Sequence, residues 1–548
     1  MRPSLRLALT ACVLAAPAPL AAQYFGQNQV QYTSFDFKVI QTEHFDVYYY
    51  DRERAAALDA ARMAERSYAR LSRILDYKFQ ERKPIILYAS HSDFQQTNAI
   101  PGGVVEGVEG VTDAYKQRNV LPFPGSYGDF EHVLTHEMVH QFQYDIWSRG
   151  HAGGGLGRLI SLNPPGWFVE GMAEYLSIGP KDAQTAMWVR DAALEGKLPT
   201  IDELTNDPRI FPYRYGHALL AYIGERWGDE AIGAILKGTL SGSLEESFRR
   251  VTGESFDQLS KEWHDAVQKR FLPEIANRQK ARAFATEMLT EEKVGGTYHL
   301  APALSPDGRQ VAFFSERNTF FVDLWLADAT TGKVKRRLFK STWSSNYETF
   351  RFINSAAAWS PDGKYLAFVA KRGPKDDIIV LDVAQNREVR RIRIPLSAAL
   401  TPSWSPDGKQ IVFSGLDGGL SDLFIVNANG TGLRRLTDDK YADLNPVWSP
   451  DGGTIAFVTD RGPETDFRTL EIGNYRIALF HLADSTVEVL PHMDRGRNAS
   501  PQWSPDGKEI AFLSDRSGVS DLYLYDLGDR DIYRLTDLYT GAQGITPT

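Results

Sequence analysis

One tetrapeptide, Ser-Pro-Asp-Gly, occurs five times in the second half of this 548-residue chain and narrows its fold more than any other feature. It stands at 305–308, 360–363, 405–408, 449–452 and 504–507, so successive copies are 55, 45, 44 and 55 residues apart. Serine, proline and glycine in this order suit a type I turn, because proline presets φ at the second position. A repeat of this length is typical of a β-propeller, whose blades are four-stranded sheets. We therefore expect an all-β propeller of four-stranded blades over residues 294–548.

The end of the chain continues the repeat. Five complete repeats are present, and residues 535–548 follow the pattern that leads into Trp448, with Pro547-Thr548 in the place of Pro446-Val447. The chain stops where a further blade would begin. This predicts either a ring cut short of six blades or an open ring with one gap.

The repeats resemble those of TolB-type, WD40-like propellers of Gram-negative envelope proteins and, more loosely, the propellers of prolyl oligopeptidases. The resemblance implies that the propeller binds an envelope protein or screens substrates. A serine hydrolase of the prolyl-oligopeptidase type is excluded, because the sequence contains no Gly-x-Ser-x-Gly nucleophile motif.

The first 22 residues are typical of a secretory signal peptide. Arg2 and Arg6 precede a short apolar run, 7–14, and a stretch of small residues ends at Ala22. The apolar run is shorter than the roughly 18 residues of a membrane span, so we expect no transmembrane segment. Residues 9–12 resemble a lipoprotein box, but the apolar run before them would be too short. We expect an exported protein of a Gram-negative-type bacterium: periplasmic, outer-membrane-associated or secreted.

Composition excludes several classes of function. Lys plus Arg is 61 and Asp plus Glu is 70, so no basic excess exists to bind nucleic acid. Cys12, the sole cysteine, lies in the signal segment, which excludes a disulfide scaffold and a cysteine-based zinc site. With 43% hydrophobic residues and a mean hydropathy of −0.34, the chain is neither disordered nor a multispan membrane protein.

Residues 23–277 predict a separate α+β domain, followed by a charged linker at 278–293. Alternating or buried apolar runs predict strands, and apolar positions three and four apart predict helices. The strands are expected at 35–40, 45–50 and 85–89, and the helices at 54–75, 129–147, 166–177, 216–227 and 255–271. The stretch 118–123 is expected to form an edge strand against which an extended peptide could lie.

The chemistry centres on His136-Glu137-Met138-Val139-His140, an HExxH motif. On a helix, residues i and i+4 lie on one face, so both imidazoles can bind one zinc ion, with Glu137 beside them to activate water. A catalytic zinc usually takes three protein ligands, so a third must come from elsewhere. The metzincin pattern is excluded, since Gln143 and Ile146 stand where it requires Gly and His.

The segment 166–175, Gly-Trp-Phe-Val-Glu-Gly-Met-Ala-Glu-Tyr, resembles the Trp-x-x-Glu-Gly-x-Ala-x-Tyr segment of gluzincins, especially the aminopeptidase N-like and peptidase MA groups. The resemblance implies that Glu170 is the third ligand and that Glu174 holds a zinc histidine in place. The stretch 212–220 is similar to a second segment of these enzymes, which implies that Tyr213 donates to the oxyanion, with Tyr215 as the alternative. Residues 103–106 faintly match the motif whose glutamate binds a free amino terminus, here Glu106. The Met and Asn of that motif are absent, which leaves endo- or exopeptidase action open.

The sequence thus predicts an exported zinc metallopeptidase with one Zn²⁺ per chain, which hydrolyses peptide bonds of a peptide or protein substrate by metal-activated water. The propeller would dock a partner or substrate. The alternative is a non-catalytic envelope scaffold, in which the propeller binds proteins and the zinc site is structural or vestigial. Metal content and peptide cleavage distinguish the two.

Overall fold

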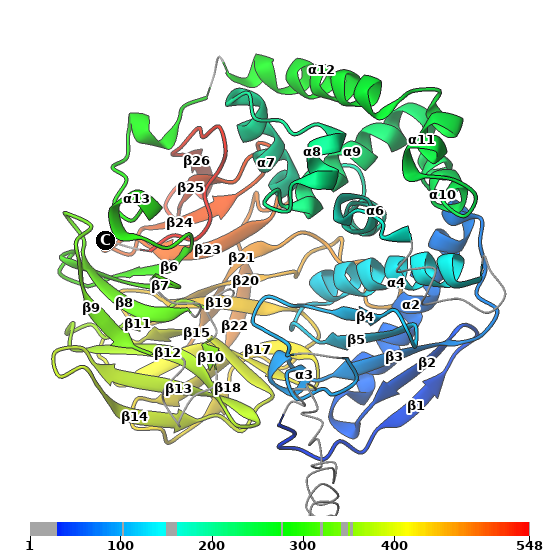
Figure 1. Ribbon diagram of the computed structural model, residues 1–548. Helices are drawn as coiled ribbons and strands as arrows, with labels where there is room; N and C mark the ends of the chain where they lie inside the picture. Colours follow the sequence, from blue (N-terminus) through cyan, green and yellow to red (C-terminus); the bar gives the residue numbers. More distant parts are fainter. Residues whose placement is uncertain are drawn as a thin grey trace, which may run out of the picture.

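The computed structural model describes residues 30–100, 103–149, 162–275, 278–317, 322–340, 349–350 and 355–546. The expected signal peptide and the Pro547-Thr548 pair lie outside the described residues. The chain forms an α-helical N-terminal region, built around one sheet, and a C-terminal β-propeller that lies against it (Figure 1).

The N-terminal region begins with a five-stranded mixed sheet in the order β1-β2-β3-β5-β4. Strands β2, β3 and β5 run parallel, and the outer strands β1 and β4 are antiparallel to their neighbours. The strands span Lys38–Gln41 (β1), Phe45–Tyr49 (β2), Lys83–Tyr88 (β3), Val111–Asp113 (β4) and Arg118–Pro122 (β5). The expectation that 118–123 forms an edge strand was wrong, because the three-residue strand β4 pairs with the outer side of β5. Strand β4 is the edge.

Two long helices, α2 (Arg54–Leu75) and α4 (Tyr127–Arg149), cover one face of this sheet. The alternation along β3 explains why: Ile85 and Leu87 pack in the core shared with the helices. Ile86 and Tyr88 point to a second, aromatic cluster on the other face, beside Phe94 of the short helix α3 (His91–Phe94). The predicted helix at 54–75 is confirmed to the residue.

The remaining helices build a bundle next to α4. They are α6 (Gly166–Ile178), α7 (Ala183–Leu194), α8 (Ile201–Asn206), α9 (Pro212–Trp227), α10 (Asp229–Gly238), α11 (Leu244–Thr252) and α12 (Phe256–Ile275). Helices α6 and α9 cross at unusually close range, with Gly171 facing Gly216. A Cβ added at Gly216 would lie 2.1 Å from the carbonyl oxygen of Trp167, and one at Gly171 would lie 2.4 Å from the carbonyl carbon of Gly216. Only glycine fits at this crossing.

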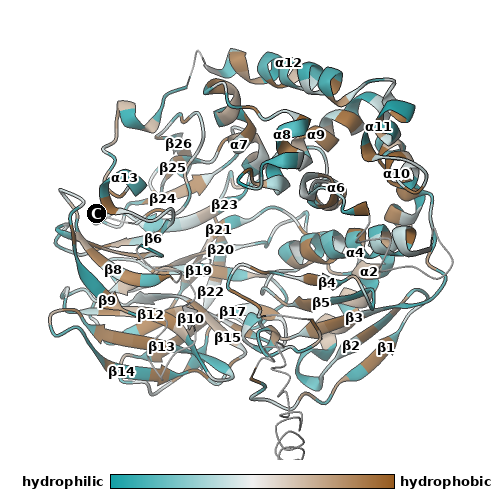
Figure 2. Ribbon diagram, in the orientation of Figure 1, coloured by the Kyte–Doolittle hydropathy of each residue, from teal (hydrophilic) through white to brown (hydrophobic). Residues whose placement is uncertain are grey.

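The propeller has five blades, each a sheet of four strands in sequence order from the inside outward. In blade 2 two short strands, β10 and β11, share the inner position. Apolar residues are concentrated in the middle strands, whereas the outer strands β9 and β14 are hydrophilic (Figure 2). The blades comprise β6 (His299–Leu304), β7 (Gln310–Ser315), β8 (Asp323–Asp328) and β9 (Val334–Phe339); β10 (Thr349–Phe350), β11 (Ala358–Trp359), β12 (Tyr365–Arg372), β13 (Lys375–Asp382) and β14 (Arg387–Arg393); β15 (Ala398–Trp404), β16 (Gln410–Asp417), β17 (Leu420–Asn427) and β18 (Arg434–Arg435); β19 (Asp443–Trp448), β20 (Thr454–Thr459), β21 (Arg476–His481) and β22 (Thr486–Val489); and β23 (Asn498–Trp503), β24 (Glu509–Ser514), β25 (Asp521–Asp526) and β26 (Asp531–Arg534).

The Ser-Pro-Asp-Gly turn repeats atom for atom. In blade 1 the Ser305 hydroxyl donates to Asp307 Oδ1 at 2.6 Å and accepts from the Gln310 backbone nitrogen at 2.9 Å. Gly308 takes a φ of 69°, which explains the invariable glycine. The tryptophan before the turn links neighbouring blades: the indole nitrogens of Trp359 and Trp404 donate to Ala303 and Ala358 of the preceding blade at 2.9 and 3.1 Å.

The C-terminal segment runs from blade 5 to the inner strand of blade 1. Ser520 bonds Ala542 in both directions, and the backbone nitrogen of Leu304 in β6 donates to Thr546 Oγ1 at 3.1 Å. The described part of this segment therefore packs between the first and last blades. The two alternatives expected from the sequence, a ring cut short of six blades and an open ring with one gap, stay predictions.

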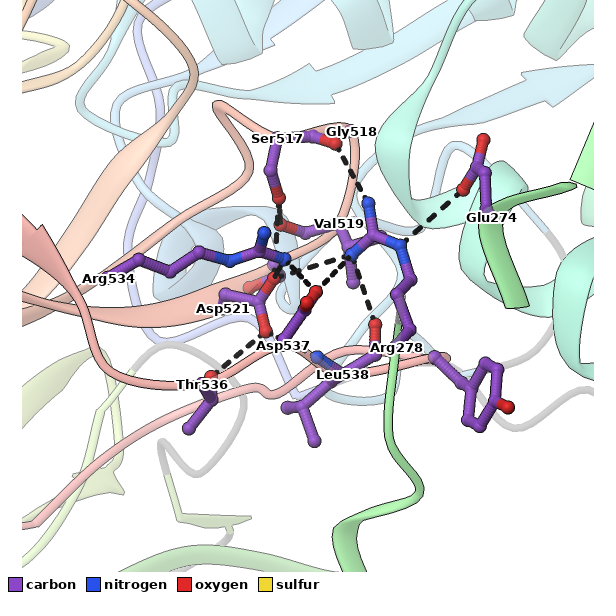
Figure 3. Close-up of polar contacts among 12 residues, drawn as sticks. Glu274, Arg278, Ser517, Gly518, Val519, Asp521, Arg534, Thr536, Asp537 and Leu538 are labelled. Carbon is purple, nitrogen blue, oxygen red and sulfur yellow. Dashed lines mark hydrogen bonds and ion pairs between the residues drawn. The ribbon is translucent and has the colours of Figure 1, made fainter. Parts of the chain in front are cut away.

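The segment that connects the helical region to the propeller is bound to blade 5 (Figure 3). Arg278, which follows α12, donates to the carbonyl oxygens of Ser517 and Leu538 at 3.1 and 3.2 Å, and it lies 3.6 Å from the buried carboxylate of Asp521. Gln279 then pairs with Leu538 as a parallel β-bridge. Two further short helices, η2 (Ala281–Ala283) and α13 (Glu291–Val294), lead into β6. The charged segment predicted as a linker is thus anchored to blade 5 at its start.

The loops at one end of the blades contact the helical region. The Gly125 carbonyl accepts from Ser421 of blade 3 at 2.7 Å, and Arg52 pairs with Asp417 of the same blade at 2.7 Å. In blade 4 the Tyr475 hydroxyl donates to Asp129, in the first turn of α4, at 2.7 Å. Among the described residues, no helix has the length and apolarity to cross a membrane.

The α6–α9 crossing gives the first prediction. Gly216→Ala should lower the free energy of unfolding of the helical region by about 3 kcal/mol, because the new methyl group clashes with backbone that cannot move aside. The matched control is Gly166→Ala at the start of α6, where the nearest atom to a Cβ is 3.6 Å away. That variant should stay within about 1 kcal/mol of wild type. Guanidinium unfolding followed by far-ultraviolet circular dichroism measures the free energy of unfolding of both variants. Equal stability of the two variants would contradict the close contact between α6 and α9.

Candidate metal centre

Helix α4 carries the HExxH motif through the middle of the helical region. It is not a surface helix with one polar face, since Thr135, His136, Glu137, His140, Gln141, Gln143 and Asp145 are all buried. Buried polar groups must be hydrogen-bonded, so α4 is bound by polar contacts on every side. Ser67 of α2 bonds Thr135 at 2.8 Å, and Gln141 donates to the carbonyl oxygen of Gln117 in the turn before β5 at 3.1 Å.

Three side-chain atoms from two helices meet at one point. The Nε2 atoms of His136 and His140 are 3.2 Å apart, and each lies 3.3 Å from Oε2 of Glu170 on α6. The structure thus brings together the two histidines of the motif and the glutamate 30 residues further on.

The other ring nitrogens of both histidines already have partners. Nδ1 of His140 lies 2.9 Å from Oε1 of Gln143, whose Nε2 donates to the Val169 carbonyl at 3.0 Å, and this second bond fixes which end of the amide faces the ring. Nδ1 of His136 lies 3.1 Å from Oε1 of Glu174. Because both Nδ1 atoms face acceptors, an imidazole protonated on Nδ1 alone has its Nε2 lone pair directed toward Glu170.

These three acceptors fit a metal ion. Three lone-pair atoms do not attract one another, and Oε2 of Glu170 is buried without a hydrogen bond of ordinary geometry. Two ligands bound tetrahedrally at about 2.0–2.1 Å lie about 3.3 Å apart, which is the spacing found here. Burial lowers the pKa of His136, but the carboxylates of Glu170 and Glu174 raise it to about 10, so the two carboxylates attract positive charge to the site, either a proton on His136 or a metal ion in its place. Two histidines and one carboxylate are a donor set that suits zinc.

Glu174 lies between three basic groups. Its carboxylate, which is only 7% exposed, faces Nδ1 of His136, Nε2 of His132 at 3.6 Å and the guanidinium of Arg214 at 3.0 Å. Burial raises the pKa of Glu174, but the nearby rings of His132 and His136 lower it to well below the usual range. A carboxylate held ionised in this way fixes the orientation of the His136 ring.

The Glu137 side chain points from α4 toward the edge of the sheet. Its Oε2 accepts a 2.5 Å hydrogen bond from the Thr112 hydroxyl, in the edge strand β4. Gly110, just before β4, packs so tightly on α4 that a Cβ there would lie 2.9 Å from Cγ of Glu137. The edge strand is therefore fixed directly against the HExxH helix.

The two tyrosines of the 212–220 stretch point in different directions. The Tyr213 ring stacks on His136 with centroids 6.1 Å apart, and burial and the charge of the Glu170 carboxylate raise the pKa of Tyr213. The Tyr215 ring instead contacts Trp188 of α7, edge to face, with centroids 6.3 Å apart. Of the two, Tyr213 is the one beside the candidate metal ligands.

Glu106 has another neighbour. Its Oε2 lies 3.8 Å from Nδ1 of His91, at the start of α3, and Glu106 is absent from the groups of described residues that could hold a metal ion. The positioning roles of Thr112, Gln143 and Arg214 were not predicted from the sequence, nor was the place of Tyr144 beside the site. The Tyr144 ring stacks on His140 with centroids 6.1 Å apart, and burial and the charges of Glu170 and Glu137 raise the pKa of Tyr144 to about 12.

Two protein families match parts of the chain. Residues 125–263, which contain His136, Glu137, His140, Glu170 and Tyr213, match a family described as a peptidase of plants and bacteria. Residues 300–458 match the TolB beta propeller domain. The C-terminal part is thus a TolB-type propeller, and the helical part is similar to a peptidase family. The gluzincin assignment stays a prediction.

Individual relatives are distant. The uncharacterized protein Atu1656 of Agrobacterium fabrum is 32% identical over 158 residues, 28% of this chain and 53% of that protein, so the chain spans about half of this curated relative. Among solved structures, TolB from Acinetobacter baumannii is 23% identical with a TM-score of 0.36, over 43% of this chain and 54% of its own. A puromycin-hydrolyzing peptidase of Mycobacterium tuberculosis is 18% identical with a TM-score of 0.33, over 43% and 36%. Likenesses this weak carry no conclusion about activity.

The contact between Arg214 and Glu174 gives the second prediction. Arg214→Ala should lower the free energy of unfolding by about 2 kcal/mol, because a buried carboxylate loses a charged hydrogen-bond donor. Arg214→Lys, which keeps the charge, should recover part of the loss. The control is Arg249→Ala, which removes an exposed ion pair to Glu245 and should cost less than about 0.5 kcal/mol. Equal losses in Arg214→Ala and Arg249→Ala, measured by guanidinium unfolding, would contradict this role.

Proposed function

We propose that the chain is a zinc-dependent peptidase, exported to the bacterial envelope, whose propeller binds a protein partner or substrate. The observation that carries the proposal is that Nε2 of His136, Nε2 of His140 and Oε2 of Glu170 lie 3.2–3.3 Å from one another. The Glu137 carboxylate is on the same helix as the two histidines. With each ring protonated on Nδ1, this gluzincin-like spacing brings three buried acceptor atoms together, an arrangement that a bound cation would stabilise. The match of residues 125–263 to a peptidase family supports the same conclusion.

In this proposal His136, His140 and Glu170 bind the ion. When bound, zinc supplies a Lewis acid that polarises the scissile carbonyl and lowers the pKa of a water molecule. Glu137 accepts the proton of the attacking water and returns it to the leaving amine. The Thr112 hydroxyl holds one oxygen of Glu137 at 2.5 Å, which leaves the other oxygen for the water.

The Tyr213 hydroxyl is the candidate donor to the oxyanion. The stacking of its ring on His136 places it beside the ligand cluster, and a donor fixed near the carbonyl stabilises the charge that develops there. Export is supported by the signal-like residues 1–22 and by the resemblance of the repeats to those of TolB-type envelope proteins.

Glu137→Gln provides the third prediction. The amide keeps the shape and the Thr112 contact but cannot accept a proton, so cleavage of a quenched fluorescent peptide library should fall at least about 10²-fold while one zinc per chain is retained. His140→Ala should lose both zinc and activity, since two ligands bind the ion much more weakly. Metal is measured by mass spectrometry of the dialysed protein. Wild type that binds zinc but cuts nothing would favour the scaffold alternative, and full activity in Glu137→Gln would require another base.

The fourth prediction separates the two tyrosines. Tyr213→Phe should lower kcat about 10²-fold without loss of zinc, as expected for a missing oxyanion donor. Tyr222→Phe, further along α9, is the control and should leave kcat unchanged. If Tyr215→Phe lowers kcat and Tyr213→Phe does not, the donor is Tyr215.

A further inference from the structure

A pocket of about 630 Å³ lies at the start of α9, one residue from Tyr213. Its wall consists mainly of rings: Trp188 of α7, Phe211 and Tyr215 around the start of α9, and Tyr298 just before β6, with Pro199 and Pro208 between them. We call these six residues the aromatic pocket. A volume of this size holds one or two side chains of a bound peptide.

The rings of this pocket are turned to solvent. Trp188 and Phe211 are each 44% exposed, and Tyr298 is 60% exposed. Single exposed apolar residues are ordinary, but several aromatic rings gathered around one hollow indicate a binding site. Trp188 and Phe211 contact each other with centroids 5.5 Å apart, so their exposed faces form one continuous surface.

Ring contacts link the aromatic pocket to the candidate metal centre. Phe211 stacks on Tyr213 at 5.1 Å, and Tyr213 stacks on His136 at 6.1 Å. An extended peptide advances about 3.3 Å per residue, so roughly three residues separate a bond at the metal ligands from a side chain in the pocket.

The chemistry of the wall defines the ligand. Aromatic rings and prolines bind apolar rings through flat contacts, as in sites that recognise aromatic or proline-containing peptides. Lys197 and Arg209 also line the pocket, so a lysine or arginine side chain is disfavoured there.

We propose that the aromatic pocket binds an aromatic or prolyl side chain of the peptide substrate, roughly three residues from the cleaved bond. This inference rests on the proposed peptidase function and specifies its substrate class. Because Tyr298 belongs to the segment that enters blade 1, the propeller part of the chain contributes to the selection.

Binding is tested apart from catalysis. The probes are two fluorescein-labelled decapeptides of alanine, glycine and glutamine, identical except for one tryptophan in the first and alanine in the second. Glu137→Gln protein should bind the tryptophan peptide about tenfold more tightly, measured by fluorescence anisotropy. Trp188→Ala/Tyr298→Ala, added to that protein, should abolish the difference. Tyr533→Ala, an exposed ring on β26, is the control and should preserve it.

Cleavage by wild type completes the test. Mass spectrometry should find the cut at a fixed distance from tryptophan when its position in the peptide is varied, and the double variant should lose this preference while it keeps its zinc. Equal binding of both peptides, or a preference that survives in the double variant, would contradict the proposal that the aromatic pocket binds such a side chain. Equal cleavage of both peptides overturns the pocket and leaves the peptidase function standing, whereas selective binding without any cleavage supports the pocket and counts against the peptidase.

Discussion

The structure depends on the burial of a polar helix. Helix α4 has seven buried polar side chains, and each is stable only with a partner close at hand. Their partners include Ser67 of α2, Thr112 of the sheet edge and the Val169 carbonyl of α6, and Tyr475 of the propeller bonds the half-buried Asp129 in the first turn of the same helix. Every layer of the molecule is therefore arranged around α4. A helix that needs so many outside partners has its side chains fixed in one orientation, as a preorganised metal site requires.

The crossing of α6 and α9 makes a second contribution to the same site. Glu170 stands next to Gly171 on α6, and Tyr213 lies three residues before Gly216 on α9, so the close contact of the two glycines determines the separation of both side chains from α4. Larger residues at the crossing would move the third candidate ligand and the tyrosine together. The contact between Gly171 and Gly216 therefore determines both the packing of α6 on α9 and the positions of Glu170 and Tyr213.

Much of this arrangement could be predicted from local sequence. The parts that could not be predicted depend on contacts between elements far apart in the chain. The Ser-Pro-Asp-Gly turns and the HExxH helix are encoded within a few residues, because turn dihedrals and the i, i+4 spacing do not depend on distant parts. The contacts of Gln143 and Arg214 join separate elements, and no local period predicts them. Strand β4 has only three residues and follows a glycine-rich stretch, so its position outside β5 was missed and the edge was assigned to 118–123. The direction of Tyr213 and Tyr215 depends on where α9 begins, and Pro212 at its first position decides it.

The two ends of each blade differ in a way that matters for evolution. At the Ser-Pro-Asp-Gly end every blade has the same turn, and its glycine sits beside the proline of the preceding blade in four cases. At the other end the connections vary from the short Gly418-Gly419 turn to the 460–475 loop, whose Thr469 and Leu470 carbonyls accept from Arg66 of α2. Insertions at this end lengthen a contact with the helical region without altering the ring. Each blade thus combines a constant Ser-Pro-Asp-Gly turn at one end with a variable loop at the other. A change in that loop alone can create a new contact with the helical region.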